Sequence, residues 1–583
     1  MKRKTITVET VAEAYLTLLA ERGIEYLFAN GGTDFAPIVE AVAALDAKGT
    51  RKLKVVSVAH ENVAVSMAHG YFLMTGRPAA VMFHVNVGTA NGINGLANCA
   101  RDNIPILFTA GRNPITEFGK TGSRDTGIQW GQEMFDQAGT VREMVKWDYE
   151  LRNVKQLETI VDRAITVAMS EPRGPVYLAL PREVLAENPG EFTFQSPTRR
   201  VAAQPSGADP HAIDEAAEIL AAAENPLIIT ASMGQNRAAV PALESLAERF
   251  ALPVISYRPR YVNISSDHPM HMGYEPGAYL PSTDAVLVID CDVPWIPVLH
   301  KLNPDAKVIH MGADPLYERY PVRGFPCDLA IKGSSGLAIP QLEEALATRE
   351  KAAKARIDER RSRIESVKAE QADANRARIE KIAAGGASMD NNWVAHCLGQ
   401  VKQDDDVLVS ESQLGIANLA LRKPGSFFGT SPSGGLGWGL GAAHGVKLGQ
   451  HDKRVFCVVG DGAYMFGNPT PAHFVSAAYD LPVLTVILNN KMWGSVRKAT
   501  LGLYPDGSAA SANQAPLTYL EPAPEYHKVV EASGGYGEEV RDPTDLPAAI
   551  ERGLKAVDVD KRQAVINVHT VYDDAAAIAD ARR

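Results

Sequence analysis

The stretch VFCVVGDGAYMFGNPTPAHFVSAAYDLPVLTVILNNKMWGSV, residues 455–496, decides the fold of this chain. Its apolar runs predict one strand over 455–459 and a second over 482–488. The segment 471–479 between them is compatible with a helix. A helical crossover returns the chain to the starting end of the sheet, so the two strands run parallel. The stretch therefore predicts a strand–helix–strand unit of a parallel sheet.

Polar residues follow both predicted strands. Gly460, Asp461 and Gly462 come after the first, and Asn490 ends the second, 29 residues beyond Asp461. Ligands bind at the carboxyl ends of open parallel sheets, and glycine lets the backbone approach a phosphate closely. Carboxylate and amide oxygens suit Mg²⁺ carrying a diphosphate. Gly-Asp-Gly alone also fits an ordinary turn with a capping aspartate, but the spaced asparagine favours the ligand site.

Length and composition set broader limits. At about 150 residues per domain, 583 residues predict three or four domains. The net charge of −10 argues against a nucleic-acid or anionic-membrane partner. The five cysteines form no CxxC pair, which argues against zinc and disulfides and predicts a reducing cytoplasm. No apolar run is long enough for a membrane span, and the N-terminus lacks the apolar core of a signal peptide.

Three α/β segments follow one another along the chain. The first shows an amphipathic helix over 8–21 and then strands alternating with helices, which predicts a doubly wound parallel sheet. Its predicted strands are 26–29, 54–59, 79–83, 104–110 and 175–181. A stretch rich in proline, serine and glycine, 195–210, is typical of a linker.

The later segments repeat this rhythm. Strands are predicted over 226–231, 253–256, 285–290 and 307–311 in the middle, and over 406–410, 455–459, 483–488 and 564–569 at the end. The charged stretch between them favours a solvated connecting helix over a partner-binding segment. We therefore predict an α/β fold of three doubly wound parallel-sheet domains. Their boundaries are 1–190, 205–345 and 386–583, with a charged helical linker over 346–385.

Gly-Asp-Gly followed by a strand ending in Asn-Asn resembles the thiamine diphosphate fingerprint. The three-domain order is similar to that of thiamine diphosphate-dependent 2-oxo acid decarboxylases and acetohydroxyacid synthases, over essentially the full chain. The resemblance implies pyrimidine-binding, central and diphosphate-binding domains. It also implies a cofactor held between subunits, hence a homodimer or homotetramer.

The resemblance assigns Glu61, in AHENVAVSMAHGY, as the carboxyl that activates the cofactor through its aminopyrimidine ring. This chemistry needs a carboxyl in a dry site that can share a proton. A glutamate at a helix N-terminus also fits a purely structural role, because the helix dipole favours it there.

The segment HVNVGTANGINGLANCARDNIPILFTAG, 84–111, is most similar to benzoylformate decarboxylases. The active-site histidine of those enzymes maps onto His84, and their active-site serine onto Thr33, which keeps the hydroxyl and adds a methyl group. Their second histidine would fall near Pro297 and is absent there, while His300 lies close by. This departure leaves the substrate and the route of proton transfer open.

The glycine-rich segment 429–449 is similar to the same enzymes. It implies that Gly434 offers its carbonyl to the aminopyrimidine and that Leu436 bends the cofactor. Mg²⁺ is assigned to Asp461, Asn490 and the carbonyl of Met492. The complete predicted cofactor-binding set is Gln413, Leu414, Gly434, Leu436, Gly460, Asp461, Gly462, Ala463, Asn490, Met492 and Trp493. Acetohydroxyacid synthases also hold FAD, but their Arg-Phe-Asp-Asp-Arg motif is missing here, so we expect no FAD.

The resemblance implies a thiamine diphosphate- and Mg²⁺-dependent lyase that decarboxylates a 2-oxo acid through an enamine. The enamine would be released as an aldehyde or ligated to a second carbonyl. One alternative is an acetolactate synthase-like carboligase using pyruvate, and another is a non-catalytic, cofactor-binding regulatory subunit. The segment 501–522 fits either a mobile lid or a long ordered loop.

Overall fold

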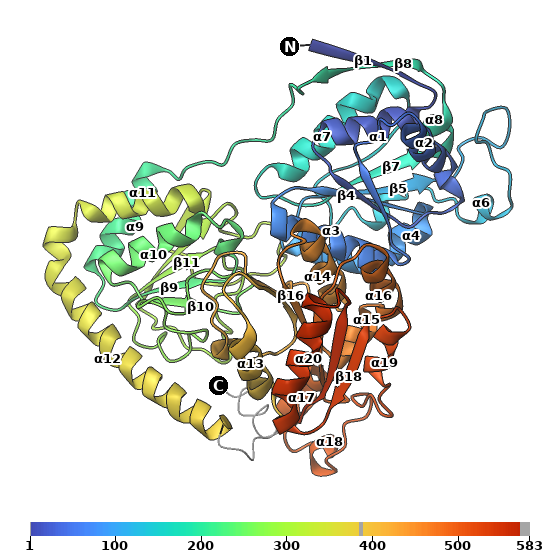
Figure 1. The fold of residues 1–583 in the computed structure, drawn as a ribbon. Coiled ribbons are helices and arrows are strands. Elements are labelled where there is room, and N and C mark those ends of the chain that lie inside the picture. The colour runs from blue at the N-terminus through green and yellow to red at the C-terminus, as the bar shows by residue number, and fades with distance from the viewer. Residues whose placement is uncertain (1, 384–388, 572–583) are drawn as a thin grey trace.

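The computed structural model describes residues 2–383 and 389–571. It contains three parallel sheets, which we call those of the first, central and last domains. Figure 1 shows the central domain beside the other two, which pack on each other. This confirms the predicted α/β class with three parallel-sheet domains. The end of the predicted linker, 384–385, and both ends of the predicted last domain, 386–388 and 572–583, lie outside the described residues.

The first domain is built on a six-stranded parallel sheet with strand order β3-β2-β4-β5-β7-β6. Thr10 caps the first helix, because its hydroxyl accepts a hydrogen bond from the Glu13 N–H. The strands are β2 (Tyr26–Ala29), β3 (Lys54–Ser57), β4 (Ala79–Phe83), β5 (Ile106–Arg112), β6 (Asp148–Glu150) and β7 (Val176–Pro181). The helices are α1 (Val11–Glu21), α2 (Ala36–Ala47), α3 (Glu61–Thr75), α4 (Val85–Asn91), α5 (Ile93–Arg101), α6 (Ile128–Gly131), α7 (Leu157–Met169) and α8 (Arg182–Ala186).

Two strands of the first domain lie outside this sheet. β1 (Lys2–Val8) pairs antiparallel with β8 (Gly190–Ser196), which joins the start of the domain to its end. The prediction that 175–181 is the last strand before the linker was therefore wrong. β8 alternates exposed and buried side chains and is followed at once by Pro197 of the linker, so its sequence signal merges with that of the linker.

The central domain has a five-stranded parallel sheet of order β10-β9-β11-β12-β13. Every residue of β9 and β11 is buried, as expected for strands covered by helices on both faces. The strands are β9 (Pro226–Thr230), β10 (Val254–Ser256), β11 (Ala285–Ile289), β12 (Lys307–Gly312) and β13 (Leu329–Lys332). The helices are α9 (Pro210–Ala222), α10 (Ala239–Phe250) and α11 (Ser335–Ala347).

The predicted charged linker is the long helix α12 (Glu350–Ala383), which runs along the outer edge of the central domain (Figure 1). It is not solvated on all sides, because Ile357 and Ile364 join the central core. Arg360 is buried and donates hydrogen bonds to the carbonyls of Leu220, Ala223 and Phe250, at the C-terminal ends of α9 and α10. A guanidinium at these ends satisfies carbonyls that the helices leave unpaired.

The last domain has a six-stranded parallel sheet of order β15-β14-β16-β17-β19-β18. β16 and β17 are neighbours in it, as the opening stretch predicts. The strands are β14 (Val407–Glu411), β15 (Phe427–Gly429), β16 (Val455–Gly460), β17 (Leu484–Asn489), β18 (Tyr536–Val540) and β19 (Ala564–His569). The helices are α13 (Asn391–Val401), α14 (Trp438–Gly449), α15 (Asp461–Phe466), α16 (Pro469–Ala478), α17 (Gly494–Leu503), α18 (Ser508–Ser511), α19 (Tyr526–Glu531) and α20 (Leu546–Asp558).

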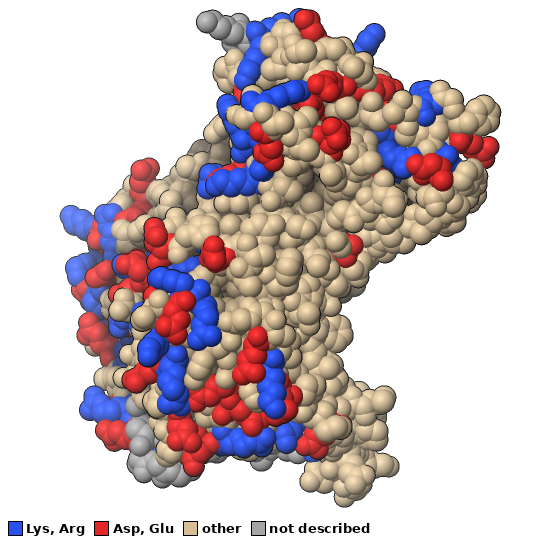
Figure 2. All heavy atoms as spheres, turned by 45° about the vertical axis from the view of Figure 1, so that its right-hand side comes forward, with Lys and Arg blue, Asp and Glu red and all other residues tan. Residues whose placement is uncertain are grey.

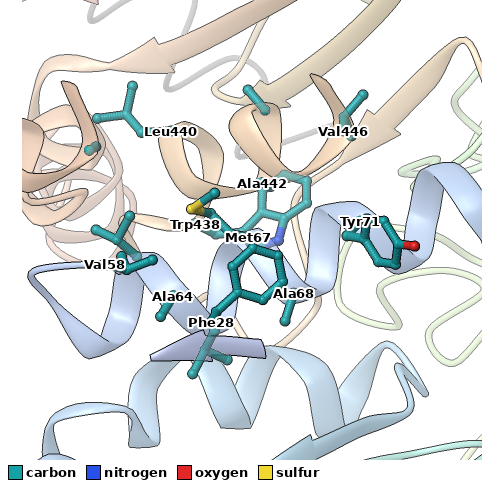
Figure 3. Close-up of a cluster of buried hydrophobic side chains, with 14 of the residues drawn as sticks. Phe28, Val58, Ala64, Met67, Ala68, Tyr71, Trp438, Leu440, Ala442 and Val446 are labelled. Carbon is teal, nitrogen blue, oxygen red and sulfur yellow. The ribbon is translucent and has the colours of Figure 1, made fainter. Parts of the chain in front are cut away.

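The first and last domains meet where α3 lies against α14. Figure 3 shows Trp438 and Ala442 of α14 facing Met67 and Ala68 of α3, with Phe28 of β2 beneath them. These side chains belong to one continuous buried cluster that spans both domains. The two parts of the chain are therefore joined through a shared hydrophobic core. Within the described residues, no helix is both long and apolar enough to cross a membrane.

Candidate active site

The tips of β16 and β17 are joined by the carboxylate of Asp461. Its Oδ1 accepts a hydrogen bond from the Gly462 N–H at 2.8 Å, and its Oδ2 accepts one from the Lys491 N–H at 2.7 Å. Burial raises the pKa of Asp461 to about 6. The two predicted polar tips are thus brought together by direct contact.

Asn490 and Met492 continue this edge of the sheet. The Asn490 Oδ1 accepts a hydrogen bond from the Met492 N–H at 3.0 Å. Together with Asp461 they offer a carboxylate, an amide oxygen and a backbone carbonyl, which are the hard donors that Mg²⁺ takes alongside phosphate oxygens. Within residues 2–383 and 389–571, no three His, Cys, Asp or Glu side chains gather as a metal site. The donor set at the strand tips fits Mg²⁺ carrying a diphosphate.

Trp493 packs directly over the glycine of the first tip. A Cβ atom at Gly462 would lie 2.1 Å from the Trp493 ring, so only glycine fits there. At Gly460 a Cβ would meet nothing within 4 Å, which leaves open space beside the tip. The predicted diphosphate region therefore combines one open and one tightly covered glycine.

The segment 501–522 folds back toward this tip. It includes the end of α17 and all of α18, and its Tyr519 forms an isolated bridge with Met492. The Trp493 N–H donates to the Thr518 carbonyl at 2.7 Å, and the Leu520 N–H donates to the Lys491 carbonyl at 2.7 Å. The far end of this segment is therefore paired with the predicted cofactor tip.

The glycine-rich segment before α14 reaches the first domain. Gly434 has a φ of +65°, and a Cβ atom there would meet nothing within 4 Å, so its backbone faces open space. Leu436 is half-buried, and its carbonyl accepts a hydrogen bond from Asn94 Nδ2 at 2.8 Å. Asn94 also donates to Asn62 Oδ1 at 3.3 Å, next to Glu61. One asparagine thus links the start of α3 to the predicted cofactor segment.

Glu411, at the tip of β14, caps α14. Its two oxygens accept hydrogen bonds from the Gly437 N–H at 2.8 Å and the Gly439 N–H at 2.7 Å. Burial raises the pKa of Glu411 to about 7. Two residues on, Gln413 Nε2 donates to Ser495 Oγ at 3.3 Å, while the Leu414 side chain is buried in the last domain's core.

In the first domain, Glu61 and His84 line one pocket of about 660 Å³ that is open to solvent, which we call the cavity. Glu61 begins α3 and is 8% exposed, and Asn91 Nδ2 donates to its Oε2 at 2.5 Å. The cavity is lined by Asn30, Gly31, Glu61, His84, Val87, Gly88, Ala90 and Asn91. A nearly dry carboxyl and an imidazole therefore share a space that a small ligand can enter.

His84 contacts an acid that the sequence did not mark as a site residue. Its Nδ1 lies 2.5 Å from Oδ1 of Asp34, and this hydrogen bond raises the pKa of His84. Thr33, the predicted hydroxyl, is exposed on the same turn, η1 (Thr33–Phe35). His300 is buried in the central domain beside Tyr257 and accepts a hydrogen bond from the Ile296 N–H at 3.1 Å.

Sequence reasoning missed Asp34, Asn91, Gln132 and Glu411. Glu411 carries a usable signal because it directly follows the predicted strand 406–410, and Asn91 lies within the quoted segment 84–111. Asp34 is adjacent to the assigned Thr33. Gln132 lies in an irregular stretch far from any motif and reaches His84 only through the fold.

Three family models match the chain. Residues 9–140 match the N-terminal TPP binding domain of thiamine pyrophosphate enzymes, 213–342 the central domain and 409–568 the C-terminal TPP binding domain. The three matches follow the order of the three sheets.

Individual proteins agree with the family models. The large subunit of acetolactate synthase isozyme 3 from Escherichia coli K12 is 24% identical over 94% of this chain and 92% of its own length. Benzoylformate decarboxylase from Pseudomonas aeruginosa is 24% identical over 84% of this chain and 88% of its own length. A thiamine diphosphate-dependent 4-hydroxybenzoylformate decarboxylase of Rhodococcus jostii RHA1 shares the fold, with a TM-score of 0.75 and 23% identity over 97% of this chain and all of that one. With its three domains matched in order, the chain belongs to the thiamine pyrophosphate enzyme family.

Proposed function

We propose that this protein is a thiamine diphosphate- and Mg²⁺-dependent lyase that decarboxylates a 2-oxo acid and releases an aldehyde or ligates it to a second carbonyl. When bound, thiamine diphosphate supplies a nucleophilic carbon and an electron sink. The observation that carries the proposal is that Glu61 and His84 line the same open cavity. An acid and an imidazole so placed can move protons beside a bound 2-oxo acid.

The roles of this chain's residues follow from their positions. Glu61 offers a carboxyl group that takes up and releases a proton beside the cofactor, and Asn91 orients this group. Asp461, Asn490 and the carbonyl of Met492 would hold Mg²⁺ at the strand tips. The other residues that the family resemblance implies would line the cofactor. They are Gln413, Leu414, Gly434, Leu436, Gly460, Gly462, Ala463 and Trp493.

We further propose that a second copy of the chain covers the site. Figure 2 shows one broad, hollowed face that carries few charged residues, whereas Lys, Arg, Asp and Glu gather toward the other side of the view. Large exposed apolar residues concentrate in the segments 115–135 and 496–519. Such surfaces are typical of protein interfaces. They support a homodimer or homotetramer, and the five free cysteines support a reducing, cytoplasmic setting.

Acetolactate synthase-like carboligation of pyruvate is the second candidate. The Escherichia coli synthase relative and Gln413, which resembles the synthases at this position, favour it. A regulatory, non-catalytic subunit is disfavoured because Glu61, Asp461 and Asn490 are all present. That FAD is absent stays a prediction.

The deciding experiment measures CO₂ release by the purified protein with added thiamine diphosphate and Mg²⁺. The substrates are pyruvate, longer aliphatic 2-oxo acids and benzoylformate, with products identified by mass. An aldehyde from a bulky 2-oxo acid supports the decarboxylase proposal, and acetolactate from pyruvate supports the second candidate. No turnover on any substrate, with the cofactor bound, contradicts both catalytic proposals for these substrates.

Asp461→Ala is expected to abolish Mg²⁺-dependent binding of thiamine diphosphate. The change removes the charged donor and also the bridge between the Gly462 and Lys491 amides. Calorimetric titration of the cofactor with and without Mg²⁺ measures the effect. Asp452→Ala, an exposed change in the turn before β16, serves as the control and should bind normally. Unchanged affinity in Asp461→Ala would refute the metal assignment.

A further inference from the structure

The carboxylate of Asp34 holds two consecutive residues of the active-site turn. Its Oδ1 contacts His84 Nδ1 at 2.5 Å, and its Oδ2 accepts a hydrogen bond from the Val85 N–H at 3.4 Å. Asp34 is 3% exposed, whereas the His84 side chain is 21% exposed and lines the cavity. The Asp34 carboxylate is thus buried, while the His84 imidazole that it contacts reaches the cavity.

The backbone around this pair is shaped for close approach. A Cβ at Gly32 would lie 2.1 Å from His84 Nδ1, and a Cβ at Gly111 would lie 1.5 Å from Asp34 Oδ2. Val85 adopts a φ of +33°, which is rare for a β-branched residue and costs conformational energy. Strain of this kind gathers at functional sites, where surrounding contacts must maintain it.

The second ring nitrogen of His84 contacts Gln132. Gln132 Nε2 lies 3.2 Å from His84 Nε2, and an amide NH₂ group can only donate. With the amide in this orientation, His84 Nε2 accepts, and the imidazole carries its proton on Nδ1 and donates it to Asp34. The Gln132 Oε1 is buried without a hydrogen-bond partner among the described residues. Rotating the Gln132 amide would offer this oxygen to a protonated Nε2.

We propose that Asp34 and Gln132 are positioning residues that make His84 a two-state proton carrier, an inference that rests on the proposed function. Asp34 keeps one proton on Nδ1, so Nε2 is the only ring atom that exchanges a proton with the substrate. Gln132 donates to Nε2 when it is bare and, after rotation, accepts from it when it is protonated. The alternative is a purely structural role, in which Asp34 only holds η1 against the turn between β4 and α4.

The proposal makes opposite predictions for two substitutions. The charged groups that face His84 are Asp34 and, across the cavity, Glu61, and both favour the protonated imidazole. Asp34→Asn removes the nearer charge and should lower the pKa of His84. Gln132→Glu adds an acceptor that cannot donate and should raise it. A tie that acts through the contact of Asp34 with the Val85 N–H alone would leave the titration of His84 unchanged.

The first measurement is the pH titration of the His84 NMR signal in the holoenzyme, with ¹³Cε1-labelled histidine and His84→Gln for assignment. Opposed shifts of the two variants support the proposal, and unchanged titration in Asp34→Asn overturns it. Asp46→Asn, an exposed change on α2, is the control and should leave the signal unmoved. Because this readout needs no turnover, it stands even if the substrate proposal fails.

Kinetics provide the second measurement. Asp34→Asn should lower kcat about 10- to 100-fold with little change in KM, because a wrongly placed proton impairs acid–base transfer while the substrate still binds. The loss in His84→Ala should not grow when Asp34→Asn is added, since Asp34 acts only through His84. Losses that multiply in the double variant would mean that Asp34 acts independently of His84.

Discussion

Replacing Glu61 with glutamine is expected to lower kcat by a factor of about 10²–10⁴ while the protein folds normally. Glutamine has the shape of glutamate but cannot take up and release a proton. Glu61 is 8% exposed and receives a hydrogen bond from Asn91, so its carboxyl group is held in one position with little water around it. Among the residues that line the cavity, His84 is the one other side chain that can transfer a proton in place of Glu61. The measurement is CO₂ release at saturating substrate and cofactor.

Two controls separate chemistry from structure in this experiment. Glu40→Gln makes the same change at an exposed position of α2 and should leave kcat unaltered. Calorimetry and thermal unfolding of Glu61→Gln should show that the cofactor still binds and that the fold is intact. Glu61 also lies in the first turn of α3, where the helix dipole stabilises a negative charge. Lost stability with near-wild-type turnover would assign it that structural role and refute the catalytic one.

The sequence predicts what depends on local periodicity. The strands β2, β4 and β19 begin and end where their apolar runs do, and β16 and β17 differ from expectation by one or two residues. Because the carboxyl ends of parallel strands share one sheet edge, the encounter of Asp461 with residues 490–492 followed from strand order alone. The fold class and this part of the candidate site were therefore accessible without a structure.

The contacts between distant segments were not accessible in this way. Gln132 meets His84 only because the stretch 113–137, which is irregular except for the short helix α6, folds back over the tip of β4. In the sequence, Asp34 has the pattern of an ordinary turn residue. Its contact with His84 depends on Gly111 of β5, which leaves room for the Asp34 carboxylate. β8 has the right alternation but pairs with the first residues of the chain, nearly two hundred positions away. No local pattern encodes such pairings.

Substituting Gly445 with alanine is expected to destabilise the protein by about 3 kcal/mol or more, through overpacking at a backbone contact. A Cβ at Gly445 would lie 2.0 Å from the Met67 carbonyl oxygen, well inside van der Waals contact. Gly441, Gly445 and Gly449 recur every fourth residue, so they form one stripe of α14 that faces α3. The helices cannot separate without opening the buried cluster that joins the two domains. Chemical denaturation followed by tryptophan fluorescence measures the loss, with the buried Trp438 as a reporter at this contact.

The same contact can be tested from its other side. A Cβ at Gly70 on α3 would lie 2.0 Å from the Ala442 carbonyl oxygen, so Gly70→Ala should destabilise the protein by a similar amount. Gly127→Ala, where the backbone is helical and a Cβ meets nothing within 4 Å, should be neutral or slightly stabilising. Because Asn94 links the start of α3 to Leu436, opening this contact should also weaken cofactor binding before the rest of the chain unfolds. Wild-type stability in both Gly445→Ala and Gly70→Ala would mean that α3 and α14 do not pack backbone to backbone. The candidate site would then not be held in place by this helix contact.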